Sequence, residues 1–390
     1  MSSALLWGVE ASPFLLKLEA MLRFQERPFR RLPAQGGFLE NLRIFIRLES
    51  AKRGRRVLRY PEMDPNLDEY PSVPFLSEDG ERFLYDSSAL GHWLDDGLAG
   101  NQLPLFPTEP RLRFIAQLID EAFDEYGLYM VHHMRWVGSA TDNAMGERTA
   151  QEMSKLVTPL LAPLIRRHLA RRQVRRCPYL LSVAPEGYTA AVAPTRIPPA
   201  RPGFPPTHDL LYESWVAYLA AMESLLAVQP WILGDRFSIA DASAYGQLSM
   251  NLVDPSAERQ LCERAPRTRQ WLEEIRDGRH AGSSGSLSLS VAAKPLLAMI
   301  MATFAPLMAQ NEQAWQRAAK RGETLFNEAA FDTGRALYDG ELLGHPFRAV
   351  AKTFQVRVWR ELRASWHQLP ESEQVALRDS LPGHALLSAD

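Results

Sequence analysis

A serine just before the first helical pattern of this chain is the residue best placed to stabilise an anion. Leu5 to Val9 is a short apolar run, and Ser12 precedes the stretch Pro13 to Phe24, where apolar residues recur at helical spacing. A helix N-terminus offers free N–H groups and the positive end of the helix dipole, so a hydroxyl there can help to stabilise an anion. A Ser-Pro pair is also an ordinary helix cap with proline at the first helical position, and both interpretations stay open.

Two further motifs lie at the ends of predicted strands. Ser72-Val73-Pro74-Phe75 places a proline at the start of a strand, which is a common position for proline. Asp86 and Ser87 follow another strand and begin a helix, where a short polar side chain is a common cap. Neither motif has a functional meaning by itself.

The most specific motif is Trp231-Ile232-Leu233-Gly234-Asp235-Arg236-Phe237-Ser238-Ile239-Ala240-Asp241. Ser238 precedes a helical stretch and Asp241 follows three residues later, which is the spacing of a capping box. We therefore expect Ser238 and Asp241 to be structural residues that contribute nothing directly to catalysis.

The elements around the first motifs predict a β-α-β unit followed by a β-hairpin and a helix. This order is the thioredoxin-like arrangement, and we expect it over residues 1–98, before a proline-punctuated linker. Its connection between the second and third strands is long, about residues 35–70, and carries an extra amphipathic helix. The expected strands are 5–9, 28–32, 73–76 and 82–85, and the expected helices are 13–24, 38–50 and 88–96.

An all-helical domain is predicted over residues 108–278. Its first helix carries a broad apolar stripe, and a proline-rich insertion at 183–208 is expected to be an irregular, mobile loop or lid because proline excludes regular helix. The insertion contains Pro185, Pro194, Pro198, Pro199, Pro202, Pro205 and Pro206, and the expected helices are 111–136, 150–173, 210–227, 239–252 and 268–276.

A glycine- and serine-rich linker at 278–290 leads to a helical C-terminal extension over residues 291–390. The most membrane-like stretch, 291–309, is interrupted by a lysine and two prolines, so we expect a buried helix and no membrane span. One later helix has an apolar face that should dock on the helical domain. That face consists of Val350, Phe354, Val358, Leu362 and Trp366.

Taken in order along the chain, the four motifs resemble the glutathione transferase superfamily. The segment from Trp231 to Asp241 closely resembles the signature of its helical domain. The resemblance implies an α+β thioredoxin-like N-terminal domain, an all-α glutathione transferase C-terminal domain and a helical C-terminal extension. The helix around 120–136 and the long tail resemble a bacterial subgroup of large transferase-like proteins, distantly similar to metaxins.

The resemblance also implies roles for five residues. Ser12 would be catalytic and would hydrogen-bond the glutathione sulfur. Val73, before a cis Pro74, would pair through its backbone with the cysteinyl backbone of glutathione. Asp86 and Ser87 would hold the ammonium and the carboxylate of the γ-glutamyl group.

The function implied by this resemblance is a glutathione transferase, with glutathione as co-substrate and a small electrophilic molecule as second substrate. Conjugation, reductive cleavage, dehalogenation and isomerisation all stay open, and a homodimer is expected. The alternative is a non-catalytic binding or scaffold protein of the same fold. A thiol-disulfide oxidoreductase would need a cysteine where Ser12 stands.

Composition argues against other classes of protein. The 390 residues include 44 basic and 46 acidic side chains, so the chain has no overall field to hold nucleic acid. The two cysteines, Cys177 and Cys262, have no metal-ligand spacing and suit a reducing cytosol. The N-terminal residues do not have the pattern expected of a signal peptide. We therefore expect a cytoplasmic protein.

Two charged or polar groups have competing interpretations. His132 and His133 point to different faces of a helix and cannot share one metal ion, so we expect no metal site there. We expect instead that they belong to a buried polar network or to a wall of the pocket for the second substrate. A basic run in the long connection is expected to be a solvated loop, the alternative being attraction of an anionic ligand. The run is Lys52, Arg53, Arg55, Arg56 and Arg59.

Overall fold

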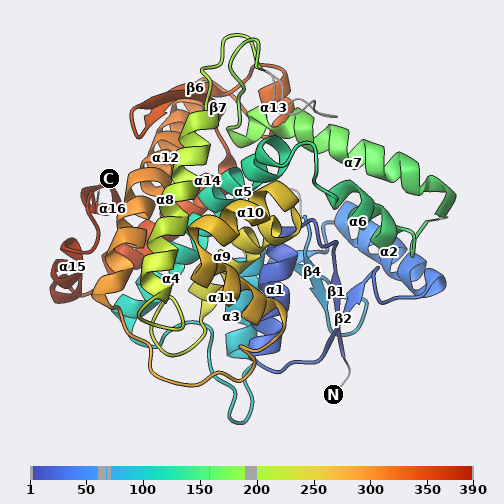
Figure 1. The fold of residues 1–390 in the computed structure, drawn as a ribbon, viewed down its shortest axis with the longest axis horizontal. Helices are drawn as coiled ribbons and strands as arrows, with labels where there is room; N and C mark the ends of the chain where they lie inside the picture. Colours follow the sequence, from blue (N-terminus) through green and yellow to red (C-terminus); the bar gives the residue numbers. More distant parts are fainter. Residues whose placement is uncertain (1–2, 60–66, 68–71, 158, 189–199, 389–390) are drawn as a thin grey trace.

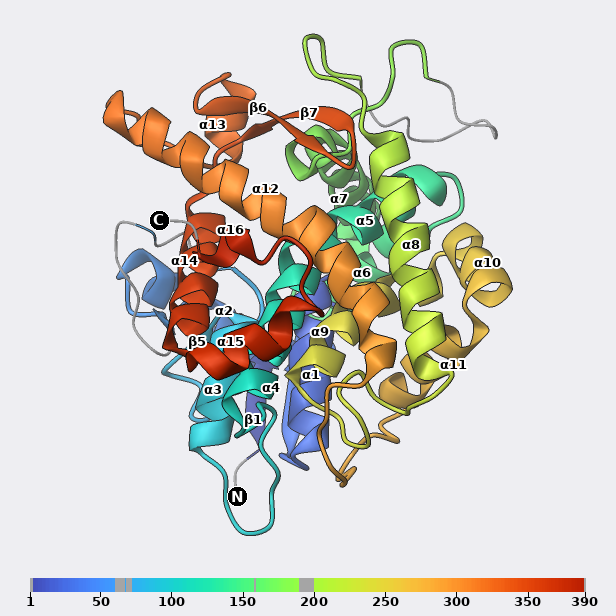
Figure 2. The same cartoon turned by 90° about the vertical axis from the view of Figure 1, so that its left-hand side faces the viewer.

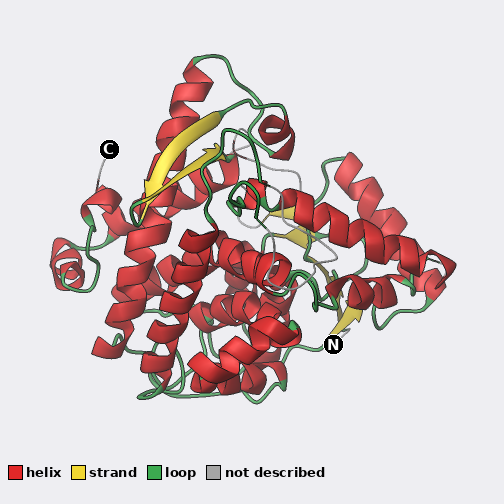
Figure 3. Cartoon of the chain, turned by 45° about the horizontal axis from the view of Figure 1, so that its top comes forward, coloured by secondary structure: helices red, strands yellow, loops and turns green. Residues whose placement is uncertain are grey.

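The computed structural model describes residues 3–59, 67, 72–157, 159–188 and 200–388. A mixed sheet lies at one side of the molecule, and helices make up most of the remainder (Figure 1). A second, two-stranded sheet lies apart from the first, with helices between them (Figure 3). The N-terminal α+β part followed by mainly helical structure agrees with the predicted fold class.

The N-terminal sheet has the strand order β2-β1-β4-β5-β3, in which β1 runs parallel to β2 and antiparallel to β4. Successive side chains alternate between its faces. Leu6 packs with α1 and the helical part of the chain, whereas Trp7 packs on the opposite face with α2. The elements are β1 (Ala4–Trp7), α1 (Pro13–Phe24), β2 (Phe29–Leu32), α2 (Phe38–Arg53), β3 (Leu58–Arg59), β4 (Phe75–Ser77), β5 (Leu84–Tyr85) and α3 (Ser87–Asp96).

These elements confirm the predicted β-α-β, β-β-α order, and α1 begins and ends at the predicted residues. The helix expected within the long connection is present as α2 and runs three residues further than predicted. The short strand β3, which pairs with β5, was not predicted because two residues carry no periodic signal.

The helical part is built around α9 (Ile239–Leu248), every residue of which is buried. It packs against α1 and α4, and the approach to α1 is close: a Cβ on Gly246 would lie 2.7 Å from the Pro13 carbonyl oxygen. Asp241 accepts hydrogen bonds from the backbone N–H groups of Ser238 and Ile232, which confirms the predicted capping box. The other helices here are α4 (Pro110–Ala122), α5 (Leu128–His133), α6 (Met145–Met153), α7 (Ala162–Arg176), α8 (His208–Leu226), α10 (Pro255–Arg264) and α11 (Pro266–Arg276).

Several predicted helices are subdivided. The expected helix at 111–136 contains two π turns, Phe123–Gly127 and Met134–Gly138, and the expected helix at 150–173 is two helices, α6 and α7, separated around Pro159. Proline lacks the N–H needed to continue a helix, which explains this break. The helix α10 was not predicted.

The proline-rich insertion is only partly described, because residues 189–199 lie outside the described residues. The flanks at 183–188 and 200–207 contain neither helix nor strand, as predicted. The base of the insertion is fixed: Val183 and Thr207 are buried, and Thr207 Oγ1 accepts from the Val183 N–H at 2.9 Å and donates to the Leu181 carbonyl.

The glycine- and serine-rich stretch at 278–290 is bonded to the helical part rather than free. The Asp235 N–H donates to the Ser286 carbonyl at 3.0 Å, and the Ser288 N–H donates to the Leu233 carbonyl at 2.9 Å. The predicted linker is therefore a strap laid against the Trp231–Asp241 motif.

The C-terminal extension is mainly helical and adds a β-hairpin that was not predicted. Its long helix α12 lies beside α8 and α14 (Figures 1 and 2). Within the described residues, the stretch Val291–Lys320 is long and apolar enough to cross a membrane, but buried core helices meet the same criterion and 56% of its most apolar 18-residue window is buried. The elements are α12 (Lys294–Lys320), α13 (Glu328–Asp332), β6 (Leu337–Leu342), β7 (His345–Val350), α14 (Thr353–Gln368), α15 (Glu371–Arg378) and α16 (Ala385–Ser388).

The predicted docking helix is α14, and it packs on α4 and α12. Val358, Leu362 and Trp366 are buried as expected, and the Trp366 ring lies 5.3 Å from the Phe114 ring. Phe354 was expected on the same buried face but is only partly buried and lines a cavity instead. Val350, also expected on this face, is the last residue of β7 and not part of α14.

Candidate functional site

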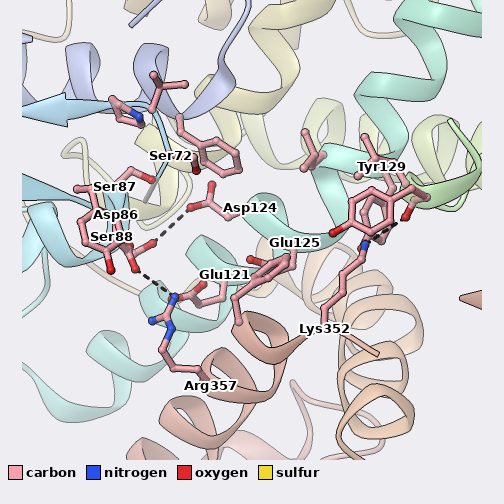
Figure 4. Close-up of a pocket in the computed structure, with 18 of the residues that line it drawn as sticks. Ser72, Asp86, Ser87, Ser88, Glu121, Asp124, Glu125, Tyr129, Lys352 and Arg357 are labelled. Atoms are coloured by element: carbon pink, nitrogen blue, oxygen red, sulfur yellow. Dashed lines mark hydrogen bonds and ion pairs between the residues drawn. The ribbon is translucent and has the colours of Figure 1, made fainter. Parts of the chain in front are cut away.

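A cavity of about 270 Å³ lies where the N-terminal sheet, the helical part and the C-terminal extension meet (Figure 4). Each of the three regions contributes polar groups to its wall. The lining includes Phe14, Val73, Pro74, Asp86, Ser87 and Ser88 from the first region, Glu121, Asp124, Glu125, Tyr129 and Tyr179 from the second, and Lys352, Phe354 and Arg357 from the third.

Four of the predicted site residues meet at this cavity. Val73, Pro74, Asp86 and Ser87 all line it, and the Val73–Pro74 peptide bond is cis, as predicted. Ser12 does not line it. Ser12 is the N-cap residue of α1, only 8% exposed, and its side chain makes no capping hydrogen bond.

Asp86 is already paired with two arginines. Its carboxylate accepts from Arg59 Nε at 2.7 Å and from Arg357 at 3.1 Å, and it caps α3 by accepting from the Ala89 N–H at 3.2 Å. Burial would raise the pKa of Asp86, but Arg357 and Arg59 outweigh it and hold the pKa at about 2. The backbone of Asp86 has a φ of 73°, a conformation that non-glycine residues rarely adopt.

The basic run divides into two kinds of residue. Arg55 and Arg56 are exposed and lie between α2 and β3, as predicted for a solvated loop. Arg53 is exposed too, but it and the half-buried Lys52 form the end of α2 and not part of a loop. Arg59 is different: its side chain is only 7% exposed and it pairs with Asp86 and with Glu361 of α14. Arg59 therefore helps to hold Asp86, a residue of the cavity wall, in place.

A buried cation ties the floor of the cavity together. Lys17 Nζ lies 2.5 Å from Asp120 and 2.6 Å from Asp124, and it also donates to Ser88 Oγ at 2.9 Å. Burial would lower the pKa of Lys17, but the two carboxylates outweigh it and hold the pKa above its ordinary value. The ammonium group thus joins α1, α3 and α4 and fixes Asp124 at the cavity wall.

Three carboxyl groups line the cavity on one face of the helix that runs from α4 into the first π turn. Glu121, Asp124 and Glu125 have the i, i+3, i+4 spacing that places side chains on one helix face. Burial raises the pKa of Asp124 to about 6 and that of Glu125 to about 8. Glu125 is therefore protonated at neutral pH, and the spacing of the acids was a signal that sequence reasoning left unused.

The extension supplies the opposite wall. Lys352 Nζ donates to the Tyr129 hydroxyl at 2.5 Å and to the Tyr179 carbonyl at 3.2 Å. Gln355 Nε2 donates to the same hydroxyl at 2.9 Å and to Glu125 at 3.1 Å. No local pattern could have identified this network, because each of these hydrogen bonds joins residues more than 170 positions apart in the sequence.

The two histidines lie in buried polar contacts, as predicted, and neither lines the cavity. His132 Nε2 pairs with Gln173 at 3.2 Å, and His133 Nδ1 pairs with Ser182 Oγ at 2.8 Å. Burial lowers the pKa of both. In the part of the chain that the structure describes, no group of three or more His, Cys, Asp or Glu side chains could hold a metal ion.

Comparison with known proteins identifies one domain family. Residues 205–274 match the glutathione S-transferase C-terminal domain, a range that includes α8, the Trp231–Asp241 motif, α9 and α10. A comparison with curated proteins gives no match.

Similar solved structures include the beta-etherase LigF from Sphingobium sp. strain SYK-6, with 17% identity and a TM-score of 0.42 over 76% of this chain and 98% of that one. A glutathione S-transferase from Pseudomonas fluorescens has 17% identity and a TM-score of 0.33 over 73% and 98%. One from Methylobacterium radiotolerans, in complex with glutathione sulfonate, has 16% identity and a TM-score of 0.36 over 74% and 99%.

Proposed function

Because residues 205–274 match the glutathione S-transferase C-terminal domain, we propose that the chain is a member of the glutathione transferase superfamily. We propose further that it binds glutathione in this cavity and activates the thiol for attack on an electrophilic small molecule. The observation that carries the proposal is the meeting of two separate segments, Val73–Pro74 and Asp86–Ser87, at one cavity. The matched family supplies the expectation of glutathione, and the cavity supplies a place for it. In this proposal residues 1–98 form the glutathione-binding domain of a cytoplasmic homodimer.

The ligand would be held by backbone and charge. The Val73 backbone would pair with the cysteinyl part of glutathione, and Ser87, at the N-terminus of α3, would bind the γ-glutamyl carboxylate with help from the helix dipole. Asp86 would act mainly by orienting Arg357. The Arg357 guanidinium has five N–H donors, and two of them donate to Asp86 and Glu361. Ser12 does not line the cavity but lies two residues before Phe14, which does, and in this proposal its hydroxyl would reach the sulfur and favour the thiolate.

Glutathione binding tests this proposal directly. The protein should be retained on immobilised glutathione and should bind free glutathione by calorimetry, and Ser87→Ala should weaken binding by about 10-fold, the scale of one hydrogen bond to a charged group. Ser224→Ala, which removes an exposed hydroxyl on α8, is the matched control. A protein that neither binds glutathione nor is retained would contradict the proposal.

A second candidate is a non-catalytic binding or scaffold protein of the same fold. Two observations favour it. Ser12 does not line the cavity, and the negative charge of Asp86 is already balanced by ion pairs with Arg59 and Arg357. This candidate predicts a folded protein that turns over none of a panel of electrophiles in the presence of glutathione.

A further inference from the structure

Tyr129 carries a hydroxyl proton that its protein surroundings do not use. Tyr129 lines the cavity from α5 and is 4% exposed. Its oxygen accepts from both Lys352 Nζ and Gln355 Nε2. A phenol oxygen has room for about two incoming donors, so its own proton must be donated elsewhere. None of the described residues accepts that proton, and the cavity is the remaining direction.

Lys352 and Gln355 hold the hydroxyl in one place. The Lys352 ammonium is buried between two aromatic rings, 4.7 Å from the Tyr129 ring centre and 4.3 Å from that of Tyr179. The Gln355 amide is fixed because it also donates to Glu125. The hydroxyl is therefore prepared to donate before any ligand arrives, which is the requirement for electrostatic stabilisation of a transition state.

The positive charge also makes Tyr129 a stronger donor. When a hydroxyl donates to an oxygen that is gaining negative charge, part of that charge moves to the phenol oxygen, and the ammonium group 2.5 Å away stabilises it. Burial raises the pKa of Tyr129 well above its ordinary value, so the proton stays in place at neutral pH.

We propose that Tyr129, polarised by Lys352, hydrogen-bonds an oxygen of the electrophile, and that the second substrates of this protein are conjugated carbonyl compounds. This inference rests on the proposed function, which supplies the glutathione thiolate. The remaining wall suits the carbon part of such a compound, because Phe14 and Phe354 line the same cavity.

The step balances without a further reagent. The thiolate forms a C–S bond with the β-carbon, the electron pair of the C=C bond moves toward the carbonyl, and the carbonyl oxygen becomes the enolate oxygen that Tyr129 stabilises. The proton that glutathione released to water is replaced by one that water delivers to the α-carbon. The sum is addition of the thiol across the double bond.

The kinetic test compares two electrophiles with one substitution. Tyr129→Phe should lower kcat/KM for a conjugated enone by about 100-fold, the scale of one lost oxyanion donor. The same variant should leave kcat/KM for an alkyl halide within about 3-fold, because charge then develops on the leaving halide and not on an oxygen. Tyr126→Phe is the matched control, since Tyr126 is buried one turn away and its hydroxyl pairs with Ser214 outside the cavity.

A binding measurement separates this inference from the proposed function, because it needs no glutathione. A saturated ketone of the enone's shape should bind Tyr129→Phe about 3- to 10-fold more weakly than the wild type, and the matching hydrocarbon should bind both equally. Lys352→Met should reduce the same ketone preference while Tyr129 remains. Equal effects on enone and halide, or an unchanged ketone affinity, would overturn the inference. Loss of glutathione binding by the wild type would instead count against the proposed function.

Discussion

Ser12 is the residue whose removal should affect chemistry more than binding. Ser12→Ala should raise the pKa of the bound glutathione thiol and slow turnover by roughly 10- to 1000-fold, the scale of one lost anion-stabilising donor. Glutathione affinity should change little, because Val73 and Ser87 line the cavity independently of Ser12. Ultraviolet titration of the thiolate in the complex measures the first effect. An unchanged thiol pKa and rate would assign thiol activation to another residue.

The loss of the Ser12 hydroxyl should cost α1 little stability. Substituting a capping serine ordinarily costs about 1 kcal/mol, but the Ser12 side chain makes no capping hydrogen bond here. The Ser12→Ala kinetics can therefore be read without a large correction for unfolding.

Glu125 should make the stability of the protein depend on pH. Burial raises its pKa from 4.5 to about 8, so the unfolded chain ionises this group before the folded protein does. The stabilising contribution is complete below 4.5 and is lost as pH rises through about 8. Urea unfolding of the wild type should therefore show a falling free energy over this range, and Glu125→Gln should remove part of the fall.

The control for this measurement is Glu263→Gln, which changes an exposed glutamate of α10. Its pH profile should follow that of the wild type. A Glu125→Gln profile parallel to the wild type would show that Glu125 ionises equally in both states.

At the scale of elements, the packing of α14 on α4 positions the cavity wall that the C-terminal extension supplies. Lys352 immediately precedes α14, and Gln355 and Arg357 lie in its first two turns, while Trp366, near its other end, packs on Phe114 of α4. Trp366→Ala should destabilise the protein by about 3–5 kcal/mol, the usual cost of removing a buried aromatic side chain.

Denaturant unfolding measures this loss, with His367→Ala as control because His367 is exposed on the same turn. If the docking holds the cavity wall, Trp366→Ala should also weaken ketone binding at the cavity. Full stability of Trp366→Ala would show that the contact between α14 and α4 contributes little.

At the scale of the whole molecule, the extension belongs to the core. Leu296, Ile300 and Phe304 of α12 are fully buried, and they share one hydrophobic core with α1 and α9. A chain ending near residue 290 should expose the surface that α12 covers and should aggregate, because large exposed apolar patches drive association. Size-exclusion chromatography of this truncation measures the outcome, and a soluble, fully active product would contradict the prediction.

Sequence alone predicted the features that depend on neighbouring residues. It predicted the start and end of α1, the Ser238–Asp241 capping box and the β-α-β order. Caps and periodicity depend on contacts within a few positions of the chain, so the local sequence determines them. The motifs of Val73–Pro74 and Asp86–Ser87 were readable for the same reason. Only the fold, however, shows that both line one cavity.

Tertiary structure alone decided which charges meet. Lys17 is 103 residues from Asp120, Tyr129 is 223 residues from Lys352, and Asp86 is 271 residues from Arg357. Such contacts leave no periodic trace, because the residue types at each end suit an exposed surface equally well. The packing of the sheet, the helices and the extension decides three features of the site. It pairs Asp86 with two arginines, it brings two donors to the Tyr129 oxygen, and it leaves Ser12 outside the cavity wall.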